Sequence, residues 1–191
     1  MEKEKHLTSV PLFDELRGER VIVRPSQPED AEALREAVVE SRDHLRPWMP
    51  WADTHQSIEE TREWLQRAIE RSKLLEEMIL SMWEIETGRY LGGTGLHPRN
   101  WEIPAFEIGY WLRKSAEGHG YVTEAMQLLV DYALKELKAR RIEIRCDERN
   151  VRSAAVAHRL GFKQEALLRN HMIAPDGVLR NTLIFSRIPG D

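Results

Sequence analysis

A tight glycine turn that leads into a helix is the feature of this sequence best suited to chemistry. The turn is Gly118-His-Gly120, and it follows an apolar and aromatic stretch from Phe106 to Leu112 whose composition is typical of a buried strand. From Tyr121 onward, apolar residues recur at helical spacing. Glycines allow backbone angles that converge several amides on one point, and the free N–H groups at a helix start attract an anion. The sequence therefore predicts a phosphate site.

The spacing of these glycines excludes two common phosphate motifs. A Walker loop requires G-x-x-x-x-G-K-[ST], and a dinucleotide fingerprint requires G-x-G-x-x-G. The segment present is Ser115-Ala-Glu-Gly-His-Gly120, which fits neither pattern. Neither motif therefore identifies the phosphate that is expected here.

The segment from Ser115 to Gly120 is close to the Q/R-x-x-G-x-G/A signature of the GNAT N-acetyltransferases. Gly118-His-Gly-Tyr-Val-Thr-Glu-Ala125 resembles the form found in the RimJ/RimL-type branch of that family. Asn150-Val-Arg-Ser153, followed by Leu160-Gly-Phe162, resembles a second motif of the branch, and His44 to Trp51 resembles its N-terminal signature. Because these matches occur in order along nearly the whole chain, the sequence is similar to RimL-type GNAT acetyltransferases.

The resemblance implies acetyl-CoA as the acetyl donor. In this family the pantetheine arm hydrogen-bonds like an added strand to the strand before the glycine turn, and the turn holds the pyrophosphate. Ser115 stands where the signature has Gln or Arg, so we expect the backbone amides of the turn to make the main contacts. The residues expected at the cofactor are Tyr110, Trp111, Leu112, Arg113 (near the phosphates), Gly118, His119, Gly120, Tyr121, Val122 and Asn150.

An amine must be neutral to accept an acetyl group, so a base or a water relay is useful. Glu107 occupies the strand position where some GNAT enzymes carry a glutamate base, although a neighbouring cation could equally hold it or it could face outward. RimL-type enzymes also carry a glutamate in the strand after the Gly-Phe pair. Met172 stands at that position and cannot act as a base, whereas His171 beside it can. The candidates are therefore His171, Glu107 or a chain of water molecules.

The departing thiolate needs a proton, and the tetrahedral oxyanion needs a hydrogen-bond donor. Ser153 matches the serine that serves as the acid in RimL-type enzymes, and Asn150 matches an asparagine that helps position the cofactor. Both residues also have a local explanation. Asn150 can cap the helix that starts there, which contributes about 1 kcal/mol, and Ser153 can be a local partner in that cap.

Two tryptophans follow the first expected helix, in the segment from Pro47 to Trp51. Trp48 and Trp51 either cap the core or line the acceptor pocket, where flat aromatic walls with one polar N–H orient a substrate. The family resemblance favours the pocket.

Apolar periodicity and turn residues predict the elements that must position these side chains. Capping boxes at Ser26 and Ser57 open two helices, and further helices follow residues 121 and 150. Strands are expected over 20–25, 78–85, 90–96, 106–112, 141–146, 162–172 and 179–188. This order predicts an α/β (α+β) fold, the GNAT fold, with a mixed and mostly antiparallel sheet of about seven strands and about four helices. By the same resemblance, splayed central strands hold the cofactor. The sequence offers no linker, so we expect a single domain over residues 1–191, with the polar residues 1–18 as an N-terminal arm.

The composition limits the kinds of partner that we expect for this protein. The net charge of −4 in 191 residues gives no general attraction to nucleic acid. No apolar run approaches the roughly 20 residues that span a bilayer, and no signal peptide is recognisable. The single cysteine, Cys146, alternates with isoleucines as a core residue does, and the histidines lack metal-ligand spacing. We therefore expect a cytoplasmic protein with no metal site and no membrane or direct nucleic-acid partner.

These observations predict an enzyme that transfers acetyl from acetyl-CoA directly to an amine in a ternary complex. By resemblance, the acceptor is a protein N-terminal α-amine, as in a ribosomal protein, and the protein is a homodimer. Two alternatives stay open. One is an N-acetyltransferase for a small amine, such as an amino acid, a polyamine, an antibiotic or an amino sugar. The other is a non-catalytic acyl-CoA-binding module, which stays open because Met172 stands at the glutamate position and cannot act as a base.

Overall fold

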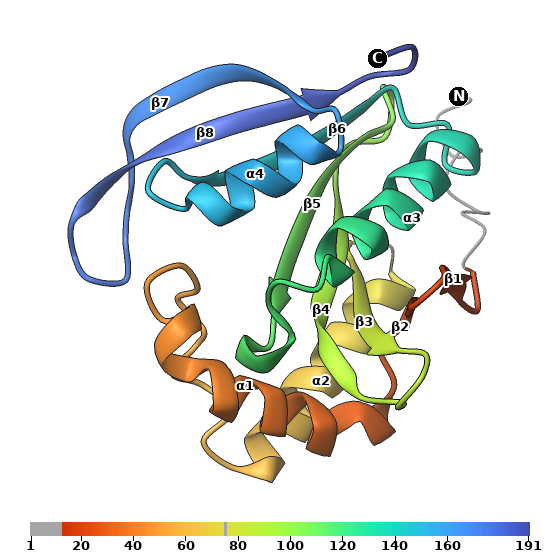
Figure 1. Cartoon of the computed structure of the whole chain (residues 1–191), viewed down its shortest axis with the longest axis vertical. Helices are drawn as coiled ribbons and strands as arrows, with labels where there is room; N and C mark the ends of the chain where they lie inside the picture. Colours follow the sequence, from red (N-terminus) through yellow and green to blue (C-terminus); the bar gives the residue numbers. More distant parts are fainter. Residues whose placement is uncertain (1–12, 75) are drawn as a thin grey trace, which may run out of the picture.

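The framework of the molecule is one mixed sheet of eight strands, seen in a computed structural model that describes residues 13–74 and 76–191 (Figure 1). The strand order across the sheet is β1-β2-β3-β4-β5-β6-β8-β7. All neighbouring strands are antiparallel except β5 and β6, which are parallel. The strands are β1 (Leu16–Arg17), β2 (Val21–Pro25), β3 (Met78–Glu84), β4 (Tyr90–Asn100), β5 (Ala105–Leu112), β6 (Arg141–Asp147), β7 (Lys163–Ile173) and β8 (Leu179–Arg187).

The helices cover both faces of this sheet and create two cores (Figure 1). They are α1 (Ala31–Leu45), α2 (Ile58–Lys73), α3 (Tyr121–Lys135) and α4 (Val151–Arg159). On one face, α1 contacts β4 and α2 contacts β3; on the other, α3 contacts β2 and α4 contacts β6. The larger core, under α3 and α4, contains the fully buried Phe106 and Met126, and the smaller core, under α1 and α2, contains Leu65 and Tyr90. The alternation of side chains along each strand supplies both cores.

Two of the predicted helix starts are confirmed. At α2, the Ser57 hydroxyl accepts a hydrogen bond from the N–H of Glu60 at 3.1 Å. At α4, the Asn150 side chain accepts one from the N–H of Ser153, also at 3.1 Å. Both side chains therefore satisfy amides that have no partner within the helix.

The capping box predicted at Ser26 is wrong. The Ser26 hydroxyl instead lies 2.8 Å from the hydroxyl of Ser81 on β3. Asp30 takes over the start of the helix, because its carboxylate accepts the N–H of Gln27 at 2.9 Å and pairs with Arg24 at 2.6 Å. A short 3-10 turn, Pro28–Asp30, therefore precedes α1.

The glycines of β4 allow the backbones of the neighbouring strands to come close. A Cβ added at Gly92 would lie 2.2 Å from the Trp111 carbonyl oxygen, and one at Gly95 would lie 2.7 Å from the Met78 carbonyl oxygen. A side chain at either position would push β4 away from β5 or β3. Gly92 therefore keeps β4 close to β5, the strand that leads toward the glycine turn, and Gly95 keeps β4 close to β3.

The sheet has one strand more than the sequence predicts. The extra strand is the two-residue β1, which lies in the part expected as an N-terminal arm. Residues 1–12 of that arm lie outside the described residues. None of the helices in the described part of the chain is both long enough and apolar enough to cross a bilayer.

Candidate active site

A groove runs between β5 and β6 because the two strands lie side by side for only three residue pairs. The last of these pairs joins Glu107 to Glu143, and β6 continues beside β8 alone in the described part of the chain. The backbone of β5 from Ile108 to Leu112 keeps one edge without a described strand partner. The groove has a volume of about 2020 Å³ and is lined by both strands, by the starts of α3 and α4, and by the β7–β8 hairpin. The open edge is suited to an extended ligand that hydrogen-bonds as a strand does.

The glycine turn lies where this groove meets the start of α3. Gly118 and Gly120 have φ angles of 82° and 81°, in the left-handed region that glycine favours, and Gly120 is the N-cap of α3. The first N–H groups of the helix have no partner within it, and no side chain caps them. A Cβ added at Gly118 would meet no described atom within 4 Å, so the turn is open. The turn therefore fits the phosphate groups that the sequence predicts for it.

Arg20, a residue that sequence reasoning missed, holds this turn from the side. Its Nη1 donates to the carbonyl oxygen of His119 at 2.8 Å. Its Nε and Nη2 contact the Glu124 carboxylate on α3 at 2.9 and 2.8 Å, and the backbone N–H of Arg20 donates to the same carboxylate at 2.7 Å. The guanidinium carbon also lies 5.4 Å from the centre of the Tyr121 ring. The start of β2 and the first turn of α3 therefore fix the glycine turn together.

Most of the residues predicted at the cofactor line the groove. They are Tyr110, Trp111, Leu112, Gly118, Gly120, Tyr121, Val122 and Asn150. His119 lies beside it: its ring stacks on that of Tyr121 at 5.5 Å, and its carbonyl binds Arg20.

The structure corrects the expectation that the Arg113 side chain lies near the phosphates. That side chain is 4% exposed and turns toward α1. Its guanidinium pairs with Glu40 and, at 2.8 Å, with Glu36, and its Nη1 donates to the Tyr90 carbonyl at 3.2 Å. Two carboxylates compete with any ligand for this cation, so Arg113 anchors α1 to the end of β5.

Ser153 lies in the groove at the start of α4, where its hydroxyl is 2.9 Å from the hydroxyl of Tyr110 on β5. Burial raises the pKa of Tyr110 to about 12, so its phenol stays protonated at neutral pH. The thiol of Cys146 lines the groove nearby and interacts with the same serine hydroxyl, and burial raises the pKa of this thiol. The two hydroxyls therefore connect β5 to the start of α4 inside the groove.

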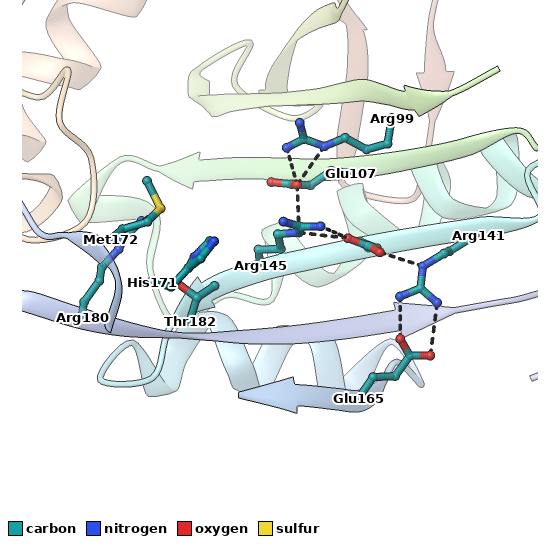
Figure 2. A network of polar contacts seen from close by, with 10 residues as sticks. Arg99, Glu107, Arg141, Arg145, Glu165, His171, Met172, Arg180 and Thr182 are labelled. Atoms are coloured by element: carbon teal, nitrogen blue, oxygen red, sulfur yellow. Dashed lines mark hydrogen bonds and ion pairs between the residues drawn. The ribbon is translucent and has the colours of Figure 1, made fainter. Parts of the chain in front are cut away.

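Glu107 lies farther along the groove in a network of ion pairs (Figure 2). Its carboxylate is 3.1 Å from Nε of Arg99 on β4 and 3.3 Å from Nε of Arg145 on β6. Arg145 also pairs with Glu143 at 2.7 Å, which extends the network along β6. This arrangement matches the alternative that the sequence left open, in which neighbouring cations hold Glu107.

His171 and Met172 both line the groove from β7 (Figure 2). Nδ1 of His171 lies 3.1 Å from the hydroxyl of Thr182 on β8, which fixes the ring. Met172 pairs across the hairpin with Arg180, whose Nη2 lies 3.1 Å from the methionine sulfur. Of this adjacent pair, only His171 has a lone pair that can accept an amine proton.

The two tryptophans predicted to share one role are separated by the structure. Trp48 lines the groove. Trp51 packs in the smaller core, where its ring centre lies 5.5 Å from that of Trp111 and 6.3 Å from that of His55. Trp48 is therefore in a position to contact an acceptor, and Trp51 supports Trp111 from behind.

A mixed sheet that splits between its two parallel strands, with an open glycine turn at a helix start beside the split, is the arrangement of the GNAT fold. The chain belongs to this family, because the model of the GNAT acetyltransferase domain matches residues 20–163. It is an acetyl-CoA-dependent N-acetyltransferase. In the part of the chain that the structure describes, no cluster of three or more His, Cys, Asp or Glu residues could hold a metal ion.

Known relatives extend over most of the chain. The probable N-acetyltransferase YjcK of Bacillus subtilis is 34% identical over 160 residues, which cover 82% of this chain and 88% of that protein. The putative ribosomal N-acetyltransferase YdaF of the same organism is 29% identical over 158 residues, 80% of this chain and 83% of its own length. A solved structure of RimL, described as a ribosomal L7/L12 α-N-protein acetyltransferase in complex with CoA, superimposes with a TM-score of 0.85. It is 23% identical and covers 91% of this chain and 97% of its own, which shows the shared fold.

Sequence reasoning missed three side chains that lie in the groove. The hydroxyl of Tyr110 was assigned no role beyond its backbone, and Arg20 and Arg180 carry no motif. A signal existed for Tyr110 alone, since an aromatic hydroxyl in an otherwise apolar strand needs a buried partner. Arg20 and Arg180 stand at strand positions where an arginine is ordinarily a solvated surface residue.

Proposed function

We propose that the groove binds acetyl-CoA along β5 and transfers its acetyl group to a protein N-terminal α-amine, with residues 1–191 acting as one catalytic domain. The observation that carries this proposal is the separation of β5 from β6 next to the open glycine turn. Gly118, Gly120 and the first amides of α3 would hold the pyrophosphate. The free edge of β5, from Tyr110 to Leu112, would hold the pantetheine arm.

When bound, acetyl-CoA supplies an activated thioester. Ser153, supported by Tyr110, donates a proton to the departing sulfur. We place the thioester beside this pair because the two hydroxyls lie in the groove between the separated strands. The RimL structure contains a disulfide between CoA and a cysteine, and the single cysteine of this chain, Cys146, lines the groove.

His171 accepts the proton of the attacking amine in this mechanism. With Nδ1 donating to Thr182, the lone pair of Nε2 is free to act as the base. Glu107, held between Arg99 and Arg145, positions the charged groups around the acceptor and is the second candidate for the base. Two variants address these roles separately. His171→Gln removes the proposed base, and Glu107→Gln disturbs the ion pairs with Arg99 and Arg145.

The names of the relatives support a protein acceptor. YdaF and RimL are both described as ribosomal acetyltransferases, and RimL as one that acts on α-amines of protein. Trp48 supplies an aromatic wall for the first residues of such a chain. A ribosomal acceptor would require a cytoplasmic location, which is part of this proposal. The homodimer suggested by the resemblance stays a prediction, which sedimentation velocity tests.

A thiol-release assay tests this function. Acetyl-CoA is offered with peptides that have free N-termini and, in parallel, with small amines such as spermidine, aminoglycosides and amino sugars. Turnover on peptides, abolished in Ser153→Ala while CoA affinity is retained, is the expected result. Turnover on small amines alone would assign a metabolite as the acceptor, and CoA binding without any turnover would leave a binding module.

A further inference from the structure

The groove contains, beside His171, an arginine that forms no ion pair with any described carboxylate. Arg20, Arg99, Arg145, Arg149 and Arg152 also line the groove, and each of them pairs with a carboxylate. Arg180 lines it too, but no described carboxylate lies within ion-pair distance of its guanidinium. Arg159 on α4 shares this property, and its side chain is exposed to solvent.

The surroundings of Arg180 leave most of its hydrogen-bonding capacity unused. Its Nε is buried and has no acceptor, and its Nη2 meets only the sulfur of Met172 at 3.1 Å. A thioether is a weak acceptor and carries no charge. Met172 is also the direct cross-strand neighbour of Arg180, at the position where a carboxylate would most easily have neutralised it. Among the described residues, this cation therefore has no carboxylate within ion-pair distance.

Arg180 is also close to the place of the reaction. It lies next to His171 and Thr182 at the end of the β7–β8 hairpin (Figure 2). Its charge acts on Asp147 and on the thiol of Cys146, both of which line the groove from β6. An anion bound by this guanidinium would lie beside the candidate base.

We propose that Arg180 binds a carboxylate of the acceptor, so that the protein selects amines that carry a carboxylate near the reacting nitrogen. The inference rests on the proposed transfer to an amine and narrows its substrate class. Two sources share this chemistry: an acidic side chain at the first or second residue of a peptide, and the α-carboxylate of a free amino acid. A planar guanidinium with free donors matches either one, because it can make two parallel hydrogen bonds to a carboxylate.

Matched acceptors test the proposal. Peptides beginning Ser-Asp are compared with peptides beginning Ser-Asn, and peptides beginning Asp-Ala with peptides beginning Asn-Ala; free serine is compared with serinamide. Hydrogen bonds to a charged group give the carboxylate member of the preferred pair an expected kcat/KM advantage of about 10-fold or more. An advantage within the peptides identifies the side-chain source, and an advantage of serine over serinamide identifies the α-carboxylate.

Variants then connect the selectivity to this residue. Arg180→Gln is expected to reduce the ratio within each pair to about 1, and Arg180→Lys to keep part of it, because a point charge lacks the two-pronged geometry. Met172→Glu, which places a carboxylate opposite Arg180, should reduce the ratio as Arg180→Gln does. Arg169→Gln is the matched control, since Arg169 is an exposed arginine on the same hairpin that does not line the groove.

Three results would overturn the proposal. They are equal kcat/KM values for both members of every pair in the unaltered protein, a ratio that persists in Arg180→Gln, and a fall in kcat of the same size for both members. The last would assign Arg180 to the transition state or to the fold. Calorimetry of the same pairs on the CoA-bound protein separates this inference from the proposed function. Preferential binding that Arg180→Gln removes would support the carboxylate site even if no amine were acetylated.

Discussion

At the scale of single residues, the hydroxyl pair of Tyr110 and Ser153 is the arrangement best suited to move a proton. The two oxygens lie 2.9 Å apart, and the Tyr110 hydroxyl is also 3.2 Å from the Ser153 carbonyl oxygen. Because burial raises the pKa of Tyr110 to about 12, this phenol can donate a hydrogen bond at any physiological pH.

Tyr110→Phe is expected to lower kcat about 10-fold, and Ser153→Ala about 100-fold or more, because general acids typically contribute factors of this size. KM for acetyl-CoA should change little in Tyr110→Phe, since the backbone of β5 stays in place. Steady-state kinetics of the single and double variants measure this. If the two residues act as a unit, the double variant is no slower than Ser153→Ala; additive losses would contradict a shared role.

Cys146 reports where the sulfur end of the cofactor lies. Incubation with the disulfide form of CoA should give a protein–CoA mixed disulfide, with one CoA thiol released for each bond formed. Exchange requires the thiolate. Burial raises the pKa of this thiol, so the rate should be low at neutral pH and rise as the pH increases toward and beyond 9.

Intact-protein mass spectrometry follows this adduct, with Cys146→Ser as the control and acetyl-CoA as a protecting ligand. A maleimide label at Cys146 without any CoA adduct would place the thiol end of the cofactor elsewhere.

Motif positions predicted Ser153 and Glu107 as candidates, but their partners depend on tertiary structure. Tyr110 and Ser153 are 43 positions apart, and they meet only because β5 and the start of α4 face each other across the groove. The pairs of Glu107 with Arg99 and Arg145 depend on the register of three strands. The residue type of Glu107 indicates that its carboxylate needs a cation as partner, but the strand register determines which cation that is.

At the scale of elements, Arg113 joins α1 to the end of β5. The Arg113 guanidinium lowers the pKa of the Glu40 carboxyl to about 2 from an ordinary value of 4.5. A folded-state pKa below the unfolded one stabilises the fold at pH values above 4.5, and this contribution is lost as the pH falls from 4.5 toward 2.

In the Glu40→Gln variant, the free energy of unfolding should therefore decrease less as the pH falls. Between pH 5.5 and pH 3, the unaltered protein is expected to lose more free energy of unfolding than the variant, by about 1–2 kcal/mol after allowance for solvent screening. Urea unfolding at both pH values measures the difference. Glu36→Gln is the control, because this carboxylate contacts the same guanidinium but is 71% exposed. An equal change in the free energy of unfolding between the two pH values for all three proteins would show that the Glu40–Arg113 pair does not contribute to stability.

The contact of β2 with the glycine turn makes a separate prediction. Arg20→Met removes the donor to the His119 carbonyl and the pair with Glu124, so the turn loses its fixed form. KM for acetyl-CoA should rise about 10-fold with kcat nearly unchanged, a loss equivalent to about 1.4 kcal/mol of binding. Arg17→Met, on the neighbouring β1, removes a surface pair with Glu15 and should have no effect. A fall in kcat alone would assign Arg20 a different role.

Local signals predicted most of the elements because each signal works within a few residues. Ser57 and Asn150 cap their helices as expected, and Gly177 has the positive φ of 81° that its turn requires. The first cap was wrong because Asp30 pairs with Arg24, a contact that only the folded sheet creates. The strand β1 was missed because two residues have no periodicity to detect.

At the scale of the whole molecule, one groove contains the glycine turn together with His171 and Arg180, so the proposed function predicts that donor and acceptor bind together. Initial-rate plots against one substrate at fixed levels of the other should therefore give intersecting lines. Parallel lines, or protein that becomes acetylated by acetyl-CoA alone, would instead indicate an acyl-enzyme intermediate.

The sheet itself consists of two parts, β1 to β5 and β6 to β8, and only three residue pairs join them at the strand level. A ligand that lies along the free edge of β5 and also contacts α4 would bridge these parts. A ligand that binds only the folded state increases the free energy of unfolding by RT ln(1 + [L]/Kd), so such a ligand would stabilise the contact between the two parts of the sheet. The lifetime of this protein against unfolding and proteolysis would then follow the supply of acetyl-CoA, which couples its abundance to the metabolic state of the cell.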